Sequence, residues 1–98
     1  MSLTFMTYYL KMYSMPELVM SEEAIADFDG LPGPIQERVI ALSQRLCRWP
    51  HVSGAKPLRH GWKGHFRIRT GDYRIIFRVQ RDIIAIVRIA HRRDVYED

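Results

Sequence analysis

The stretch HFRIRTGDYRIIFRV, residues 65–79, decides the fold of this chain. Apolar and basic residues alternate in it with a period of two, the pattern of a β-strand that buries one face and exposes the other. In its middle, Gly71-Asp72 suits a two-residue hairpin turn with glycine at the first central position. The stretch therefore predicts two antiparallel strands joined by a tight turn.

A two-residue turn also fixes which residues face one another across the hairpin. Apolar partners then meet on an inner face, while three arginines converge on the outer face. The pairs expected from this register are Phe66–Phe77, Arg67–Ile76, Ile68–Ile75 and Arg69–Arg74.

A further strand is expected after a second turn near Arg81-Asp82. The run Ile83–Ile89 is apolar enough for an interior position in the sheet. We expect the core to be faced by its odd positions, Ile83, Ala85, Val87 and Ile89.

This arrangement would gather four or five arginines on the outer face of the sheet. Like charges side by side on neighbouring strands are destabilising. The cluster therefore predicts an anionic partner, with phosphate the best match for planar guanidinium groups. Its expected members are Arg67, Arg69, Arg74, Arg88 and also Arg78.

The segment before the hairpin predicts a short strand and two helices. The strand is ELVM, residues 17–20, and Ser21 is a plausible N-cap for a helix that Gly30 ends. A second helix begins at Pro34 and ends at Pro50. Its buried stripe is expected to contain Ile35, Val39, Leu42, Leu46 and Trp49.

Length and composition limit the chain to one small domain. With 98 residues and 47% hydrophobic content, it suits one domain over 1–98 with an α+β fold, in which two N-terminal helices pack on a small antiparallel β-sheet. Residues 1–15 fit no periodic pattern, and we treat them as a poorly ordered or non-native extension. Because Cys47 is the one cysteine and neither a secretory signal nor a membrane span is evident, we expect a cytoplasmic protein without membrane contact.

Charge is divided unequally along the chain. Residues 1–54 carry a formal charge of −2, whereas residues 55–98 carry +6, from eleven Lys and Arg against five Asp and Glu. Nine of those eleven cations are arginine, the residue favoured for bidentate phosphate contacts. The basic surface therefore belongs to the predicted strands, and a nucleic acid is the favoured partner.

Three stretches carry a resemblance to a known family. They are LPGPIQERVIALSQRLCRWP (31–50), KPLRHGWKGHFRIRTGDYRIIFRV (56–79) and IAHRRDVY (89–96). Together they resemble the RelE/ParE superfamily of bacterial toxins, in its RelE-like branch, over the chain from about Pro16 to its C-terminus. These toxins are the toxic halves of type II toxin–antitoxin pairs, and they resemble small microbial ribonucleases in fold.

The resemblance implies an endoribonuclease that cuts mRNA in the ribosomal A site and is neutralised by a cognate antitoxin. It implies cleavage without metal or cofactor, in which the ribose 2′-OH attacks the adjacent phosphate. Arg74 and Arg92 would hold the scissile phosphate, and Tyr96 would stack on a base or orient the 2′-OH. The implied catalytic positions are Arg67, Arg69, Arg74, Arg92 and Tyr96.

One departure from the family concerns proton transfer. The best-known member has lysines where this chain has Arg67 and Arg69, and arginine stays protonated, so it serves poorly as a general base. Tyr96, His65 or His91 must then take the proton, unless the ribosome assists. His60 and His65 lack the neighbouring ligands of a metal site, and we expect none.

Further contacts to RNA are expected around the hairpin, in the loop that precedes it and in the basic end of the chain. Two alternatives stay open: a ParE-like toxin that blocks DNA gyrase, and a catalytically weak paralogue that only binds its antitoxin. The expected RNA-binding residues are Lys56, Arg59, Trp62, Lys63, Arg78, Arg88 and Arg93.

Overall fold

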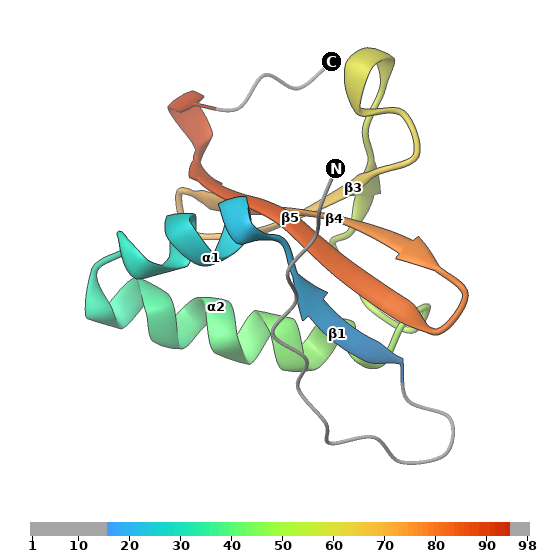
Figure 1. The fold of residues 1–98 in the computed structure, drawn as a ribbon, viewed down its shortest axis with the longest axis horizontal. Coiled ribbons are helices and arrows are strands. Elements are labelled where there is room, and N and C mark those ends of the chain that lie inside the picture. The colour runs from blue at the N-terminus through green and yellow to red at the C-terminus, as the bar shows by residue number, and fades with distance from the viewer. Residues whose placement is uncertain (1–15, 95–98) are drawn as a thin grey trace.

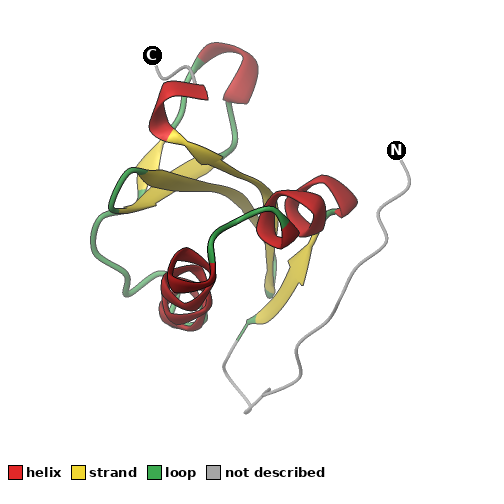
Figure 2. Ribbon diagram, turned by 90° about the vertical axis from the view of Figure 1, so that its left-hand side faces the viewer, coloured by secondary structure: helices red, strands yellow, loops and turns green. Residues whose placement is uncertain are grey.

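The computed structural model describes residues 16–94. Two helices cover one face of a five-stranded sheet, as two views of the ribbon show (Figures 1 and 2). The elements are β1 (Glu17–Met20), α1 (Glu22–Asp29), α2 (Gly33–Leu46), β2 (Lys56–Pro57), the 3-10 turn η1 (His60–Trp62), β3 (Phe66–Thr70), β4 (Tyr73–Gln80), β5 (Ile83–His91) and the 3-10 turn η2 (Arg92–Asp94).

The strands follow the spatial order β1-β5-β4-β3-β2. Neighbours are antiparallel except β1 and β5, which run parallel. The predicted α+β class is confirmed, but the expected antiparallel sheet gains one parallel pair. Two helices and three strands separate β1 from β5 along the chain, so no tight turn fixes their relative direction.

The predicted hairpin is confirmed residue by residue. β3 and β4 pair in the expected register, from Phe66 opposite Phe77 to Arg69 opposite Arg74. Gly71 has a φ of 59°, a left-handed conformation that glycine adopts without strain. The turn residues and the alternation of apolar and basic residues, both local properties, therefore specify the same register for this hairpin.

The predicted phase of β5 is wrong over its first half. Ile84 and Ile86 are fully buried, whereas Ile83 is 40% exposed. The register with β4 shifts at this point: Phe77 pairs with Ile86, but Ile76 pairs with Arg88, so Val87 is an extra residue in β5. Such a bulge exchanges the two faces of a strand, and only beyond it does the odd position Ile89 face the core as expected.

α1 begins as predicted, whereas α2 begins one residue before the predicted Pro34, at Gly33, and ends early. The Ser21 hydroxyl accepts a hydrogen bond from the Ala24 N–H, which caps α1. α2 ends at Leu46, so Trp49 lies beyond the helix, and its ring packs edge-on against Phe66 at 4.9 Å and Phe77 at 5.6 Å. The main buried cluster contains Leu18, Met20, Ala24, Val39, Leu42, Leu46, Ile68, Ile75, Phe77, Ile84, Ile86 and Ile89.

The second face of the sheet, opposite the helices, is called the outer face below. Within residues 16–94, no helix has the length and apolar character needed to cross a membrane.

Candidate functional site

Cations of three strands share the outer face of the sheet. Arg69 lies opposite Arg74 in the register of β3 and β4, and Lys56 of β2 lies opposite Arg67. Directly opposed like charges are destabilising on a sheet, and an anion laid across them removes that repulsion. We call this surface the outer basic face; it consists of Lys56, Arg67, Arg69, Arg74 and Arg78.

The end of β5 is joined to the tip of the β3–β4 hairpin. The Arg92 N–H donates to the Asp72 carbonyl at 2.6 Å, and the Arg92 Nε lies 3.6 Å from the Asp72 Oδ1. The Arg74 Nη1 donates to the Arg92 carbonyl at 3.4 Å. These contacts bring together the predicted catalytic residues Arg74, in β4, and Arg92, in the turn η2 that follows β5. We call this junction of Asp72, Arg74 and Arg92 the hairpin-tip junction.

The described part of the chain holds four of the five predicted catalytic residues. Arg67, Arg69 and Arg74 lie on the outer basic face, and Arg92 lies at its end, in η2. Tyr96 falls outside residues 16–94, so its prediction is neither supported nor opposed by the structure.

His91 lies on the opposite side of the sheet from these arginines. It pairs with Tyr73, and the two rings meet edge-on at 5.3 Å. Tyr73 precedes Arg74, and neighbouring residues of a strand point to opposite faces, so both rings lie on the helix side. There His91 lines a polar cleft with Ala26 and Leu31, near the end of α1.

His91 is held in that place by two polar neighbours. Its Nδ1 accepts a hydrogen bond from the Arg93 N–H at 3.3 Å, and its Nε2 lies 4.0 Å from the Asp72 Oδ2. His91 thus lies on the helix side of the sheet, but at its end, where one carboxylate, that of Asp72, is near both His91 and Arg92.

His65 lies before β3, where its ring meets that of Trp62 edge-on at 5.2 Å. Its Nδ1 is buried and has no hydrogen-bond partner among residues 16–94. Trp62 is half-buried, whereas Arg59 and Lys63 are exposed on either side of η1. In the described ranges, no three His, Cys, Asp or Glu side chains are grouped as metal ligands.

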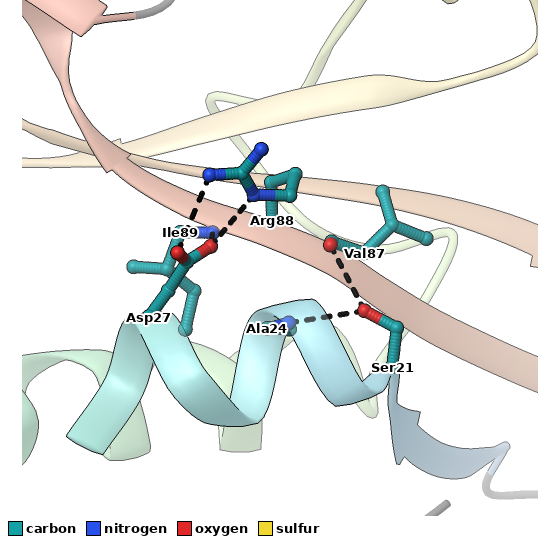
Figure 3. A network of polar contacts seen from close by, with 6 residues as sticks. All are labelled: Ser21, Ala24, Asp27, Val87, Arg88 and Ile89. Carbon is teal, nitrogen blue, oxygen red and sulfur yellow. Dashed lines mark hydrogen bonds and ion pairs between the residues drawn. The ribbon is translucent and has the colours of Figure 1, made fainter. Parts of the chain in front are cut away.

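Arg88 takes part in a contact with α1 that the sequence did not suggest. Its guanidinium donates to both carboxylate oxygens of Asp27, at 2.8 and 3.3 Å, and the Ile89 N–H donates to the same carboxylate at 2.9 Å (Figure 3). The hydrogen bond to Asp27 raises the pKa of Arg88 further above its already high ordinary value. In the register Arg88 lies opposite Ile76, on the outer face as predicted, but its guanidinium is turned to the edge of β5 and bound to Asp27.

The same edge explains why α1 follows β1 directly. β1 ends opposite Ile86, and among residues 16–94 no strand pairs with β5 on this side beyond that point. The Ser21 hydroxyl donates to the Val87 carbonyl at 2.9 Å, and the Asp27 carboxylate accepts a hydrogen bond from the Ile89 N–H (Figure 3). Side chains of α1 and its cap thus replace the missing strand.

Sequence reasoning missed the roles of Asp27 and Asp72. The residue pattern explained Asp27 as a helix residue and Asp72 as a turn residue. Because each local role accounted for the aspartate, the pattern gave no reason to expect a distant partner. A signal for Asp72 did exist, because one acidic residue stands among arginines in RIRTGDYR.

Comparisons with known proteins agree with this fold. Residues 18–96 match the family model of the ParE toxin of the type II toxin–antitoxin system parDE. The toxin RelG of Mycobacterium tuberculosis is 40% identical over 73 residues, which cover 71% of this chain and 83% of that protein. The toxin RelE3 of Methanocaldococcus jannaschii is 25% identical over 84 residues, 83% of this chain and 96% of that protein.

A solved structure gives the same result. The crystal structure of the toxin–antitoxin complex RelBE2 from Mycobacterium tuberculosis contains a chain with a TM-score of 0.68 and 30% identity, and the match covers 76% of this chain and 94% of that one. The family model spans most of this chain, and the fold and the relatives agree with it. The chain therefore belongs to the RelE/ParE superfamily of toxins of type II toxin–antitoxin systems, on its RelE-like side.

Proposed function

We propose that this toxin is an endoribonuclease that cuts mRNA on the ribosome. The observation that carries the proposal is the hairpin-tip junction, which brings Arg74 and Arg92 together at the end of the outer basic face. Two guanidinium groups that reach the same phosphate can hold its two nonbridging oxygens. The remaining cations of the face can hold the phosphates that follow.

The reaction proposed is a transfer within the RNA. The ribose 2′-oxygen forms a bond to the adjacent phosphorus, and the bond between that phosphorus and the 5′-oxygen breaks. The proton of the 2′-OH goes to a base, and the departing 5′-oxygen takes up a proton. Negative charge grows on the nonbridging oxygens, where preorganised donors such as Arg74 and Arg92 stabilise the transition state most.

The candidates for the general base of this reaction are Tyr96, His65, His91 and groups of the ribosome. Arg67 and Arg69 serve as an electrostatic clamp, because arginine stays protonated. His91 lies on the helix side of the sheet, but its Nε2 is 4.0 Å from the Asp72 carboxylate that contacts Arg92. We assign Tyr96 the orientation or deprotonation of the 2′-OH, with His65 and His91 as the alternatives.

The proposed partner in the cell is a small antitoxin. The support comes from a relative: the structure of RelBE2 is that of a toxin–antitoxin complex. With mRNA and the ribosomal A site as the target, an antitoxin that covers the outer basic face would exclude the RNA. The remaining residues proposed to contact RNA are Arg59, Trp62, Lys63 and Arg93.

The test is cleavage of mRNA on purified ribosomes, with 5′ ends mapped by primer extension. The wild-type toxin should give cuts at A-site codons, and Arg74→Ala and Tyr96→Phe should lose them. Arg81→Ala is the matched control, because Arg81 lies in the turn at the other end of β4. Intact mRNA with wild-type toxin, or full cleavage by Arg74→Ala, would contradict the proposal.

A second candidate is a ParE-like toxin that blocks DNA gyrase, which the name of the matching family model favours. The two candidates separate in one experiment. If the toxin leaves mRNA intact on ribosomes and stops gyrase from supercoiling plasmid DNA, the gyrase reading is correct.

A further inference from the structure

Asp72 is an acidic residue placed among the arginines of the proposed site. Its carboxylate lies 3.6 Å from the Arg92 Nε and 4.0 Å from the His91 Nε2. Its carbonyl accepts the Arg92 N–H at 2.6 Å. One residue of the β3–β4 turn thus contacts both the backbone and the side chain of Arg92.

We propose that Asp72 is a positioning residue for Arg92, an inference that rests on the proposed function. The Arg92 side chain is 64% exposed, and an exposed arginine samples many rotamers unless a partner restricts it. A carboxylate beside Nε restricts it on one edge of the guanidinium and leaves both terminal amino groups for a phosphate. Arg92 is then preorganised for the transition state.

The positioning role predicts that removing the Asp72 carboxylate slows cleavage, whereas its negative charge alone predicts that removal favours RNA binding. A carboxylate near the outer basic face repels RNA, so Asp72→Asn should leave RNA binding unchanged or make it tighter. Without its partner, however, Arg92 must be ordered during the reaction, and the cleavage step should slow. If Asp72 positions Arg92, the Asp72→Asn variant should therefore keep its affinity for RNA and lose cleavage rate.

The chain offers a matched control in Asp82. Like Asp72 it is an exposed aspartate in a hairpin turn, but it follows β4, at the opposite end of that strand from Asp72. Asp82→Asn makes the same change of charge away from Arg92. Comparing the two variants removes the general effect of net charge on RNA binding.

The experiment measures single-turnover cleavage and, separately, affinity for an RNA with a 2′-deoxy group at the scissile position. For Asp72→Asn, cleavage should fall about tenfold, less than the roughly 100-fold or larger loss expected for a donor itself. Affinity should stay equal or increase. Asp72→Glu, which restores the carboxylate, should recover most of the loss, and Asp82→Asn should cleave like the wild type.

A double-mutant cycle decides whether Asp72 acts through Arg92. In an Arg92→Ala background, Asp72→Asn should cause no further loss. An equal loss in both backgrounds, or wild-type cleavage by Asp72→Asn, would overturn the proposal. A loss of both affinity and cleavage accompanied by a lower melting temperature would also overturn it, because it would show a merely structural role.

A second measurement does not depend on activity. The side-chain Nε–H signal of Arg92 in a proton–nitrogen NMR spectrum should shift in Asp72→Asn and stay in place in Asp82→Asn. If the wild type cleaves no RNA, the proposed function fails, while this signal still tests the contact. An unchanged Arg92 signal in Asp72→Asn would refute the contact itself.

Discussion

Replacing Asp27 by alanine should destabilise the protein markedly more than replacing Asp29, an exposed aspartate of the same helix. Asp27 binds three groups at once: two guanidinium nitrogens of Arg88 and the N–H of Ile89. Its side chain is only 19% exposed, whereas that of Arg88 is 47% exposed. The variant would remove the carboxylate that accepts hydrogen bonds from a backbone N–H and a charged side chain, at the edge of β5 beyond the end of β1.

The magnitude follows from these two parts. An unsatisfied, partly buried N–H costs about 1 to 3 kcal/mol. The ion pair with the half-exposed Arg88 adds about 0.5 to 1 kcal/mol, because solvent screens it. We expect a total of about 1.5 to 4 kcal/mol, which corresponds to a fall in melting temperature on the order of 10 °C for a domain of this size.

The assay is urea unfolding followed by circular dichroism, with three variants beside Asp27→Ala. Arg88→Ala removes only the ion pair and should cost about 1 kcal/mol or less. Asp27→Asn keeps an acceptor for the Ile89 N–H and should lie between these two. Asp29→Ala, an exposed aspartate of the same helix, is the matched control and should be nearly neutral.

Two results would refute this reasoning. If Asp27→Ala costs no more than Asp29→Ala, the carboxylate does not hold the edge of β5. If Arg88→Ala costs as much as Asp27→Ala, the ion pair rather than the backbone contact supplies the stability.

Three further outcomes are expected. Arg74→Ala should lower the cleavage rate about 100-fold or more, since it removes a preorganised donor; single-turnover cleavage on ribosomes measures this, and equal rates for Arg74→Ala and the control Arg81→Ala would contradict it. Burial raises the pKa of the Cys47 thiol, so less thiolate is present near neutral pH, and iodoacetamide should modify Cys47 more slowly than a cysteine peptide, with the rate rising as pH increases; mass spectrometry follows the reaction, and equal rates would oppose this reading. Ile84→Ala should cost about 2 to 5 kcal/mol in urea unfolding because Ile84 is fully buried, whereas Ile83→Ala, at a position 40% exposed, should cost under about 1 kcal/mol; the reverse order would place the bulge in β5 elsewhere.

The sequence predicted the hairpin and its arginines because the forces that set them are local. A two-residue turn with glycine at its first position allows one register, and alternation then places Phe66 and Ile68 on one face and Arg67 and Arg69 on the other. The cap at Ser21 and the helix that follows were local in the same way. The catalytic roles of these arginines and of Tyr96 came from the family resemblance and stay predictions.

Only the tertiary structure decided the features that depend on distant partners. The bulge at Val87 arises where β5 must pair with β4 on one side while β1 ends on the other, and no pattern within β5 shows it. The contact of Asp27 with Arg88 joins residues 61 positions apart.

The arginine-rich hairpin illustrates both what local sequence determines and what only the tertiary structure decides. From the sequence alone, residues 65–79 determine a strand pair with a basic face, since turn and alternation act over a few residues. The packing of β5 against β4 then brings Arg92 to Asp72 and Arg74, because contacts between separate strands are set by the whole sheet. A basic face thus comes from local sequence, while the junction proposed to hold a phosphate comes from the fold.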